Sequence, residues 1–354
     1  MANRYEERIN KVFDKINSTS EALLVTNLKN IRYLTGFKGS FAVGILTYKG
    51  LYLLVDFRYF EQARKEALAE IVLFKDSWIN ALMKFIDELK IKKLSFEVTC
   101  TVDIFLKLSS NKNIELVPQY YVIEQLRAIK EEEEIEKIKV AVKIAEESFL
   151  KIKPIIKEGI TEKTIATALE NEIKKQSDTL PFPVIVASGS NSSMPHWRNS
   201  NKKLNRGDFV IIDWGAEYEG YFSDMTRTFI IGEINNKKKE IYDIVNEARR
   251  QAILSCKADV PAKDIDLSAR NLIKQSGYEE YFGHATGHGV GLDVHEFPKI
   301  NHNSEDVIKP GMVFTVEPGI YIEGLGGVRI EDMVVVRENT VETLTTLSRD
   351  LEIL

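Results

Sequence analysis

Residues 207–232, GDFVIIDWGAEYEGYFSDMTRTFIIG, constrain the fold more than any other stretch, because apolar and polar side chains alternate along them. Such alternation predicts a β-hairpin. A register centred between Tyr218 and Glu219 puts Asp213 directly opposite Asp224 on one face of the sheet, with Cβ atoms ~5 Å apart. At ~4 Å and an effective dielectric constant of about 20, the two charges would repel by about 4 kcal/mol. The pair therefore requires solvent, a basic partner or a metal ion.

Two further carboxylates interrupt apolar runs near the C-terminus. Glu317, in GMVFTVEPGIYI, precedes a proline, which favours extended backbone and predicts a strand end. In GGVRIEDMVVV, Arg329 and Glu331 are two residues apart and hence on one face of a predicted strand. A charge inside a buried strand is costly unless it is paired or bound to a ligand. For either carboxylate alone, an edge strand facing water is the alternative.

The segment GHATGHGVGLDVHE contains His284, His288 and His295, three of the five histidines in the chain. Its glycines form only an incomplete GxGxxG pattern, so a nucleotide site is not predicted. They favour instead a tight segment in which backbone and ligand approach closely. Four carboxylates with an imidazole suit Mn, Fe, Co or Zn better than a thiolate-binding metal. Two such ions ~3.5–4 Å apart can activate a water molecule near neutral pH.

Length and composition limit the class of protein. The chain has 354 residues, of which 44% are hydrophobic and 29% charged, enough for about two soluble domains. The net charge of −5 disfavours nucleic acid as a partner. No apolar run approaches the ~20 residues that span a bilayer, and the start, MANRYEERIN, lacks the apolar core of a secretory signal. Cys100 and Cys256 are far apart, as expected of reduced thiols in a cytoplasmic protein.

Two regions differ in their patterning. Over residues 1–126, short runs of β-forming residues alternate with helical periodicity, which predicts a small α/β domain. The acidic run IKEEEE predicts the solvated first turns of a long helix, and Thr161 predicts the N-cap of the next helix. The remaining pattern predicts an α+β domain over residues 127–354. Its expected elements are strands near 183–188, 207–215 and 221–230, helices near 237–257 and 262–276, and strands near 311–317 and 327–336.

The order of carboxylates and histidine resembles that of the pita-bread metallopeptidases, the family of methionine aminopeptidase, aminopeptidase P and prolidase. The similar stretches are VIIDWGAEYEGYFSDMTRT, GHATGHGVGLDVHE, VFTVEPGIYI and GGVRIED. NIRYLTGFKGSFAV and VDFRYFEQA resemble the small domain of bacterial Xaa-Pro peptidases. The resemblance covers nearly the whole chain. It implies a creatinase-like N-terminal domain followed by a pita-bread catalytic domain.

The resemblance also implies a role for each site residue. The implied metal ligands are Asp213, Asp224, His288, Glu317 and Glu331. Glu317 is also implied to carry a proton from water to the proline nitrogen. His196, His284 and His295 are implied to line the pocket and stabilise negative charge on the carbonyl oxygen. Arg329 is implied to orient a ligand carboxylate; a plain ion pair within the strand is the alternative.

The sequence departs from the family near His196. Relatives often have LPHG, whereas this chain has MPHW, so Trp197 either narrows the pocket or fills a gap. His302, in NHNS, matches no family motif and is expected at the surface.

The implied activity is hydrolysis of the bond between a first residue and a following proline, with two divalent ions, Mn above Co, Zn or Fe. We expect an Xaa-Pro aminopeptidase acting on a proline-containing peptide, because Arg329 is the only basic residue that the motifs place at the metal centre. A strict dipeptidase must bind the free proline carboxylate, for which Arg58 or a second subunit is the alternative source of a cation. An Xaa-Pro dipeptidase (prolidase) is therefore the alternative activity. By analogy with related proline peptidases, a homodimer is expected.

Three other interpretations fit the residues less well. Methionine aminopeptidases usually lack the N-terminal domain. Metal-free hydrolases of the creatinase type lack the metal carboxylates, all of which are present here. Catalytically inactive pita-bread binding modules have lost ligands, so the intact set argues against that interpretation.

Overall fold

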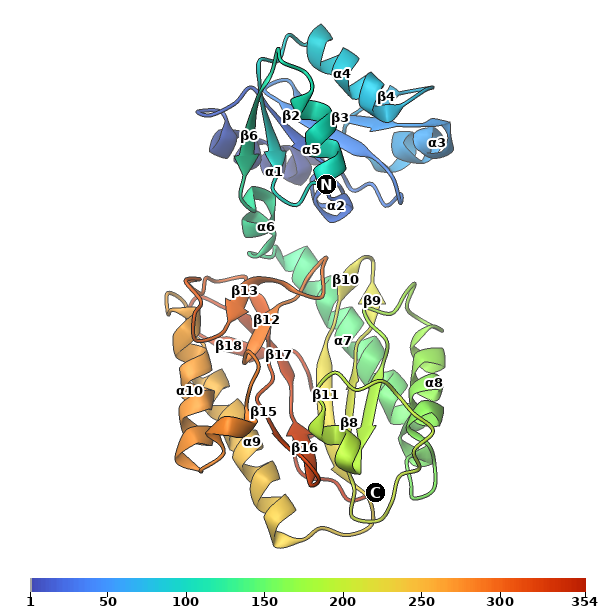
Figure 1. The fold of residues 1–354 in the computed structure, drawn as a ribbon, viewed down its shortest axis with the longest axis vertical. Helices are drawn as coiled ribbons and strands as arrows, with labels where there is room; N and C mark the ends of the chain where they lie inside the picture. The colour runs from blue at the N-terminus through green and yellow to red at the C-terminus, as the bar shows by residue number, and fades with distance from the viewer. Residues whose placement is uncertain (1) are drawn as a thin grey trace. The chain divides into compact units, whose positions relative to one another are not determined.

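The computed structural model of the chain describes residues 2–354, which form two compact units divided between Arg127 and Ala128 (Figure 1). The N-terminal unit is α/β and the C-terminal unit is α+β, so the predicted fold class is confirmed.

A mixed six-stranded sheet forms the centre of the N-terminal unit, with the strand order β4-β3-β2-β1-β5-β6. Strand β2 pairs antiparallel with both β1 and β3, and the three other pairings are parallel. The apolar runs predicted as strands supply the core, and Leu24, Ile45 and Leu54 are completely buried. The strands are β1 (Ala22–Val25), β2 (Val43–Thr47), β3 (Gly50–Val55), β4 (Glu70–Leu73), β5 (Lys93–Glu97) and β6 (Glu115–Gln119). The helices are α1 (Ala2–Ile16), α2 (Leu28–Thr35), α3 (Phe57–Glu66), α4 (Trp78–Glu88), α5 (Val102–Ser109) and α6 (Val122–Arg127).

Antiparallel strands fill the C-terminal unit between two pairs of helices, α7 with α8 and α9 with α10 (Figure 1). The helices are α7 (Glu132–Ile152), α8 (Glu162–Ile173), α9 (Asn236–Ser255) and α10 (Ala262–Gln275). The first half contributes β7 (Ile185–Ser188), β8 (Phe209–Trp214), β9 (Glu217–Tyr218), β10 (Tyr221–Phe222) and β11 (Met225–Ile230). The second half contributes β12 (Gly287–Gly289), β13 (Glu296–Ile300), β14 (Val313–Val316), β15 (Gly319–Ile322), β16 (Gly326–Arg329), β17 (Asp332–Val336) and β18 (Val341–Thr343).

The predicted hairpin is present, but its predicted register is wrong by two residues. The β8–β11 ladder pairs Asp213 with Thr226, not with Asp224. The turn is centred on Glu219 and Gly220, which both have positive φ, 47° and 83°. Two left-handed central residues are typical of a type I′ hairpin turn. Because a shift of two preserves the alternation, Asp224 stays on the same face as Asp213, in a diagonal position.

The strand predicted over residues 327–336 is two strands in different sheets. β16 pairs with β15 and β17 with β14, and the chain changes sheet at Ile330 and Glu331. The N–H of Glu331 donates to the carbonyl of Thr226, 3.1 Å away, and thus to the neighbouring strand β11. Glu331 therefore lies at a break between strands rather than inside one.

Helices α7 and α8 begin at the residues that the sequence predicted, with one difference in burial. Thr161 caps α8, as predicted, by accepting a hydrogen bond from the N–H of Thr164. The acidic run begins α7, where Glu131 and Glu134 form a capping box. Glu134 is buried rather than solvated, and it accepts a hydrogen bond from the hydroxyl of Tyr221 at 2.7 Å.

Both cysteines are free thiols, Cys256 buried and Cys100 half-buried. Within residues 2–354, no helix is long and apolar enough to cross a membrane.

Candidate active site

Five ligand-type side chains, predicted from separate motifs, are brought together in the C-terminal unit. Asp213 lies on β8, Asp224 just before β11, His288 on β12, Glu317 just after β14 and Glu331 between β16 and β17. One ligand atom from each of Asp224, His288 and Glu331 lies within 4.8 Å of the others. Nε2 of His288 is 3.6 Å from Oδ2 of Asp224 and 3.4 Å from Oε1 of Glu317. Residues on or beside strands β8, β11, β12, β14 and β16 thus converge on one small polar centre.

Burial and mutual repulsion both disfavour the ionised form of the four carboxyl groups in this centre. Burial and the neighbouring carboxylates raise the pKa values of Asp224 and Glu331 well above their ordinary range. Burial also raises the pKa values of Asp213 and Glu317, although nearby basic side chains oppose it. Such a cluster is stable only if protons or cations offset its negative charge.

His288 presents a neutral nitrogen to this cluster. Its Nδ1 lies 3.2 Å from the carbonyl oxygen of Gly289, to which it donates, so the Nε2 lone pair faces the carboxylates. Burial lowers the pKa of His288, which favours the neutral ring. A neutral imidazole whose other nitrogen is held by a carbonyl is a typical metal ligand.

Asp213 offers a free oxygen on the same centre. Its Oδ2 accepts a charge-assisted hydrogen bond from Nη2 of Arg329 at 2.7 Å. Its Oδ1 is buried and has no hydrogen-bond partner among the residues described. Arg329 Nε also donates to the hydroxyl of Thr226, which donates to Oε2 of Glu331 at 2.7 Å. An orphaned carboxylate oxygen beside three further carboxylates and one imidazole fits divalent cations of the Mn, Fe, Co and Zn group.

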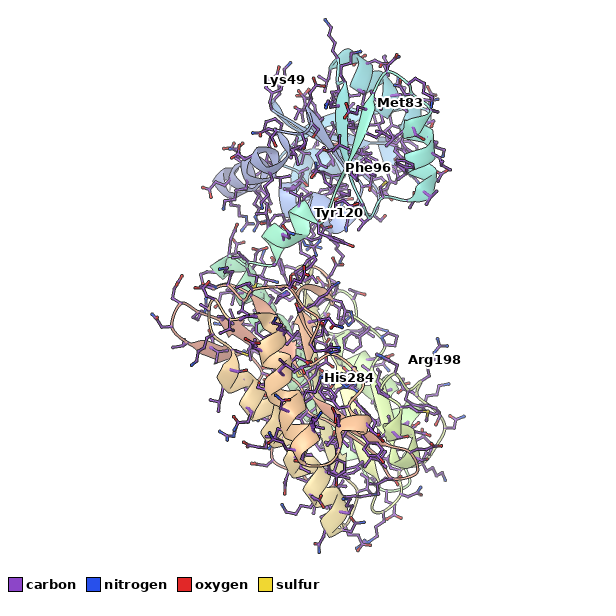
Figure 2. The ribbon with its side chains drawn as sticks, turned by 60° about the vertical axis from the view of Figure 1, so that its left-hand side comes forward. Lys49, Met83, Phe96, Tyr120, Arg198 and His284 are labelled. Carbon is purple, nitrogen blue, oxygen red and sulfur yellow. The ribbon has the colours of Figure 1, made fainter. Side chains whose placement is uncertain are left out.

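Both ring nitrogens of His284 have hydrogen-bond partners. Its Nδ1 lies 2.7 Å from the carbonyl oxygen of Ala285, and its Nε2 lies 2.9 Å from the hydroxyl of Tyr321. Burial lowers the pKa of His284, so the ring is neutral and Nε2 accepts from Tyr321. Arg329 donates to the same hydroxyl at 3.0 Å, and burial raises the pKa of Tyr321 to about 12. His284, labelled in Figure 2, is half-buried, and its two ring nitrogens face Ala285 and Tyr321.

His295 and His196 lie on the exposed side of the centre. The ring of His295 is 4.1 Å from that of His288. His196 is exposed and lies close enough to Asp213 to interact with it electrostatically. The neighbouring Arg198 is also exposed, at the surface in Figure 2.

The surroundings of Trp197 and His302 answer what the sequence left open about them. Trp197 donates its indole N–H to Oε2 of Glu162 at 2.9 Å, so its side chain is held by the scaffold. His302 is exposed, as expected.

Helix α10 anchors the segment that carries His284 and His288. Asp266 is completely buried, pairs with Arg270 at 2.9 Å and accepts from both the N–H and the hydroxyl of Thr286. Arg270 donates to the carbonyl of His284 at 2.9 Å. This support was not predicted, because its partners lie far apart in the sequence.

The glycines beside His288 are required by close approach of backbone, as the sequence suggested. A Cβ on Gly287 would lie 1.9 Å from the carbonyl oxygen of Thr315, and one on Gly289 would lie 2.0 Å from that of Phe297. Any side chain at either position would push the neighbouring strand away from the centre.

Comparison with known proteins places these features in a family. Residues 136–338 match "Metallopeptidase family M24", and residues 8–129 match "Creatinase/Prolidase N-terminal domain". An Xaa-Pro dipeptidase of Pyrococcus horikoshii is 38% identical, over 98% of this chain and 98% of that protein.

Two solved structures are also similar over nearly the full length. An Xaa-Pro dipeptidase from Bacillus anthracis has a TM-score of 0.96 and 40% identity, covering 99% of this chain and 100% of that one. An X-Pro aminopeptidase from Thermotoga maritima has a TM-score of 0.88 and 40% identity, covering 95% and 98%. By its sequence and its fold, the chain belongs to metallopeptidase family M24, in which divalent metal ions are implied.

Proposed function

We propose that this protein hydrolyses the peptide bond between an N-terminal residue and a following proline. The observation that carries the proposal is the convergence of the five ligand-type side chains, with an orphaned oxygen on Asp213, in one polar centre. The relatives named as Xaa-Pro peptidases support the choice of substrate.

Two divalent ions fit the donor set. Asp213, Asp224, His288, Glu317 and Glu331 would hold them. When bound, the ions would supply Lewis-acid polarisation of the scissile carbonyl and activation of a water molecule. We favour Mn²⁺, with Co²⁺, Zn²⁺ and Fe²⁺ as alternatives, because oxygen donors outnumber the single imidazole.

The chain itself moves the proton and stabilises charge. Glu317, whose pKa is raised by burial, is suited to take a proton from the attacking water and pass it to the proline nitrogen. His295 and His196 are exposed beside the centre, where a ring N–H can donate to the carbonyl oxygen as negative charge develops on it. Arg329 holds Asp213 in orientation, and His284 acts through Tyr321.

We favour the dipeptide as substrate, although the sequence patterns favoured longer peptides. Relatives named Xaa-Pro dipeptidase include the structure with a TM-score of 0.96. The aminopeptidase stays as the second candidate, supported by the similar structure from Thermotoga maritima. Two ion pairs also support the aminopeptidase. Arg329 is paired with Asp213, and the exposed Arg58 is paired with Asp56, so both arginines already have a carboxylate partner other than a substrate.

A paired assay tests the proposal. Ala-Pro and Ala-Pro-Ala are offered at equal concentration to the protein loaded with Mn²⁺. We expect rapid release of alanine from Ala-Pro and slow release from Ala-Pro-Ala. The reverse order would make the protein an aminopeptidase, and absence of cleavage with any of the four metals would remove the enzymatic proposal.

A further inference from the structure

The loop that carries His196 is fastened at both ends to one buried carboxylate. Glu162, the first residue of α8, is completely buried. Its Oε1 accepts hydrogen bonds from the start of the loop, and its Oε2 from the end. The donors to Oε1 are the N–H and hydroxyl of Ser188, both at 2.8 Å, and the amide of Asn191 at 2.9 Å. The donors to Oε2 are the indole of Trp197 at 2.9 Å, and the N–H and hydroxyl of Ser200 at 3.1 and 2.7 Å.

All these donors are neutral groups. They can all donate toward Glu162 only while its carboxylate is ionised. Burial alone would raise the pKa of Glu162, but the hydrogen bonds from Ser200, Asn191, Trp197 and Ser188 outweigh it and lower the pKa. An ionised carboxylate only accepts hydrogen bonds, so both oxygens of Glu162 can face the donors at the two ends of the loop. A glutamine of the same shape would turn an NH₂ group toward donors at one end of the loop.

The middle of the loop reaches the strand that leads to the metal centre. The hydroxyl of Ser192 accepts a hydrogen bond from the N–H of Gly327 on β16 at 2.8 Å. Nη1 of Arg329 lies 3.5 Å from the carbonyl oxygen of Pro195, the residue before His196. The loop thus joins Glu162 to the polar centre, and His196 occupies the stretch between Pro195 and the Trp197 anchor.

We propose that Glu162 is a positioning residue that fixes the loop of residues 188–200 and so holds His196 at the metal centre. The proposal rests on the proposed function, in which His196 stabilises the developing charge. Trp197 is the nearest link, because its indole N–H ties the residue after His196 directly to Glu162. This gives the departure from the family's LPHG a role in holding the loop.

Four single substitutions and one double variant test the proposal. Glu162→Gln removes the charge, and Trp197→Phe removes one donor while keeping an aromatic ring, in case the first variant folds poorly. Ser193→Ala is the matched control, because its hydroxyl donates within the same loop to Ser190 and not to Glu162. His196→Ala, alone and combined with Glu162→Gln, completes a double-mutant cycle.

In E162Q we expect kcat for the Mn²⁺-loaded protein to fall by about tenfold or more, since misplacement of a reacting group is costly. KM and metal content should change by less than about threefold, because the contacts that bind the metal ions and the ground-state substrate are not altered. Amide exchange over residues 188–200 should accelerate by about tenfold, with β11 unchanged. W197F should show the same pattern more weakly, and S193A should behave as the wild type.

The cycle separates positioning from general support. In the H196A background, E162Q should cause no further loss of kcat. An equal fractional loss with and without His196 would overturn the proposal, as would unchanged exchange over residues 188–200 in E162Q. If the wild-type protein cleaves no Xaa-Pro peptide, the proposed function fails, and exchange in the metal-free variants then decides whether Glu162 holds the loop.

Discussion

Replacing Asp224 with asparagine should stabilise the metal-free protein while abolishing its stabilisation by metal. The ligand atoms of Asp224 and Glu331 lie within 4.8 Å of each other, and Asp224 is 5% exposed. At that distance, with an effective dielectric constant of about 20, two carboxylates repel by about 3 kcal/mol. Asparagine keeps the shape and removes this repulsion. For a unit of this size, about 3 kcal/mol corresponds to roughly 6–12 °C in Tm.

The effect depends on pH in a defined direction. The folded-state pKa of Asp224 is raised by burial and by Glu331, so the folded protein binds more protons than the unfolded chain. The free energy of unfolding of the metal-free protein should therefore fall as pH rises above the ordinary aspartate value of about 4. In D224N this fall should be shallower, so the difference between the two proteins should be largest in alkaline buffer.

The assay is thermal unfolding of both proteins after removal of metal with EDTA, between pH 5 and pH 9, with and without Mn²⁺. Asp178→Asn is the control, since Asp178 is exposed and its replacement should change stability by less than about 0.5 kcal/mol. Excess Mn²⁺ should raise the Tm of the wild type and leave that of D224N unchanged. A metal-free D224N that melts below the wild type at pH 9, or that keeps the full Mn²⁺ effect, would refute the reasoning.

Three further results are expected. Metal analysis after loading with Mn²⁺ or Co²⁺ should give close to two ions per chain, and a protein that binds none under these conditions would contradict the proposed centre. His288→Ala should weaken metal binding, whereas His295→Ala should keep the metal and lose turnover; the opposite pattern in metal content would exchange the two roles. Light scattering should show a homodimer, and a fully active monomer at assay concentration would disprove that expectation.

The hairpin shows how far local sequence carries a prediction. Alternation was enough to place both aspartates on one face, because a side chain's face depends only on the period of two. The register depended on the turn, where Glu219 adopts a positive φ of 47° that glutamate rarely adopts. Gly220 was the available signal, since glycine is common in the second central position of type I′ turns.

The supporting residues carried no comparable signal. Glu162 and Asp266 are helix residues with ordinary spacing, and the loop residues that they hold, such as Ser200 and Thr286, lie 38 and 20 residues away in the chain. Tyr321 lies in an apolar strand, where a half-buried aromatic side chain is common, and only the structure shows its hydroxyl between His284 and Arg329. Such roles arise from tertiary contacts, so an isolated sequence cannot distinguish them from ordinary core positions.

Glu331 and Asp332 show why a carboxylate alone does not identify a metal site. Both are buried and adjacent in the chain, yet Asp332 makes ion pairs of 2.6–3.1 Å with Arg227, Arg249 and Arg349. Burial would raise the pKa of Asp332, but the arginines outweigh it and lower the pKa to about 2. Burial and neighbouring carboxylates instead raise the pKa of Glu331. Because arginines already neutralise Asp332, only Glu331 retains the uncompensated charge that a divalent cation would offset.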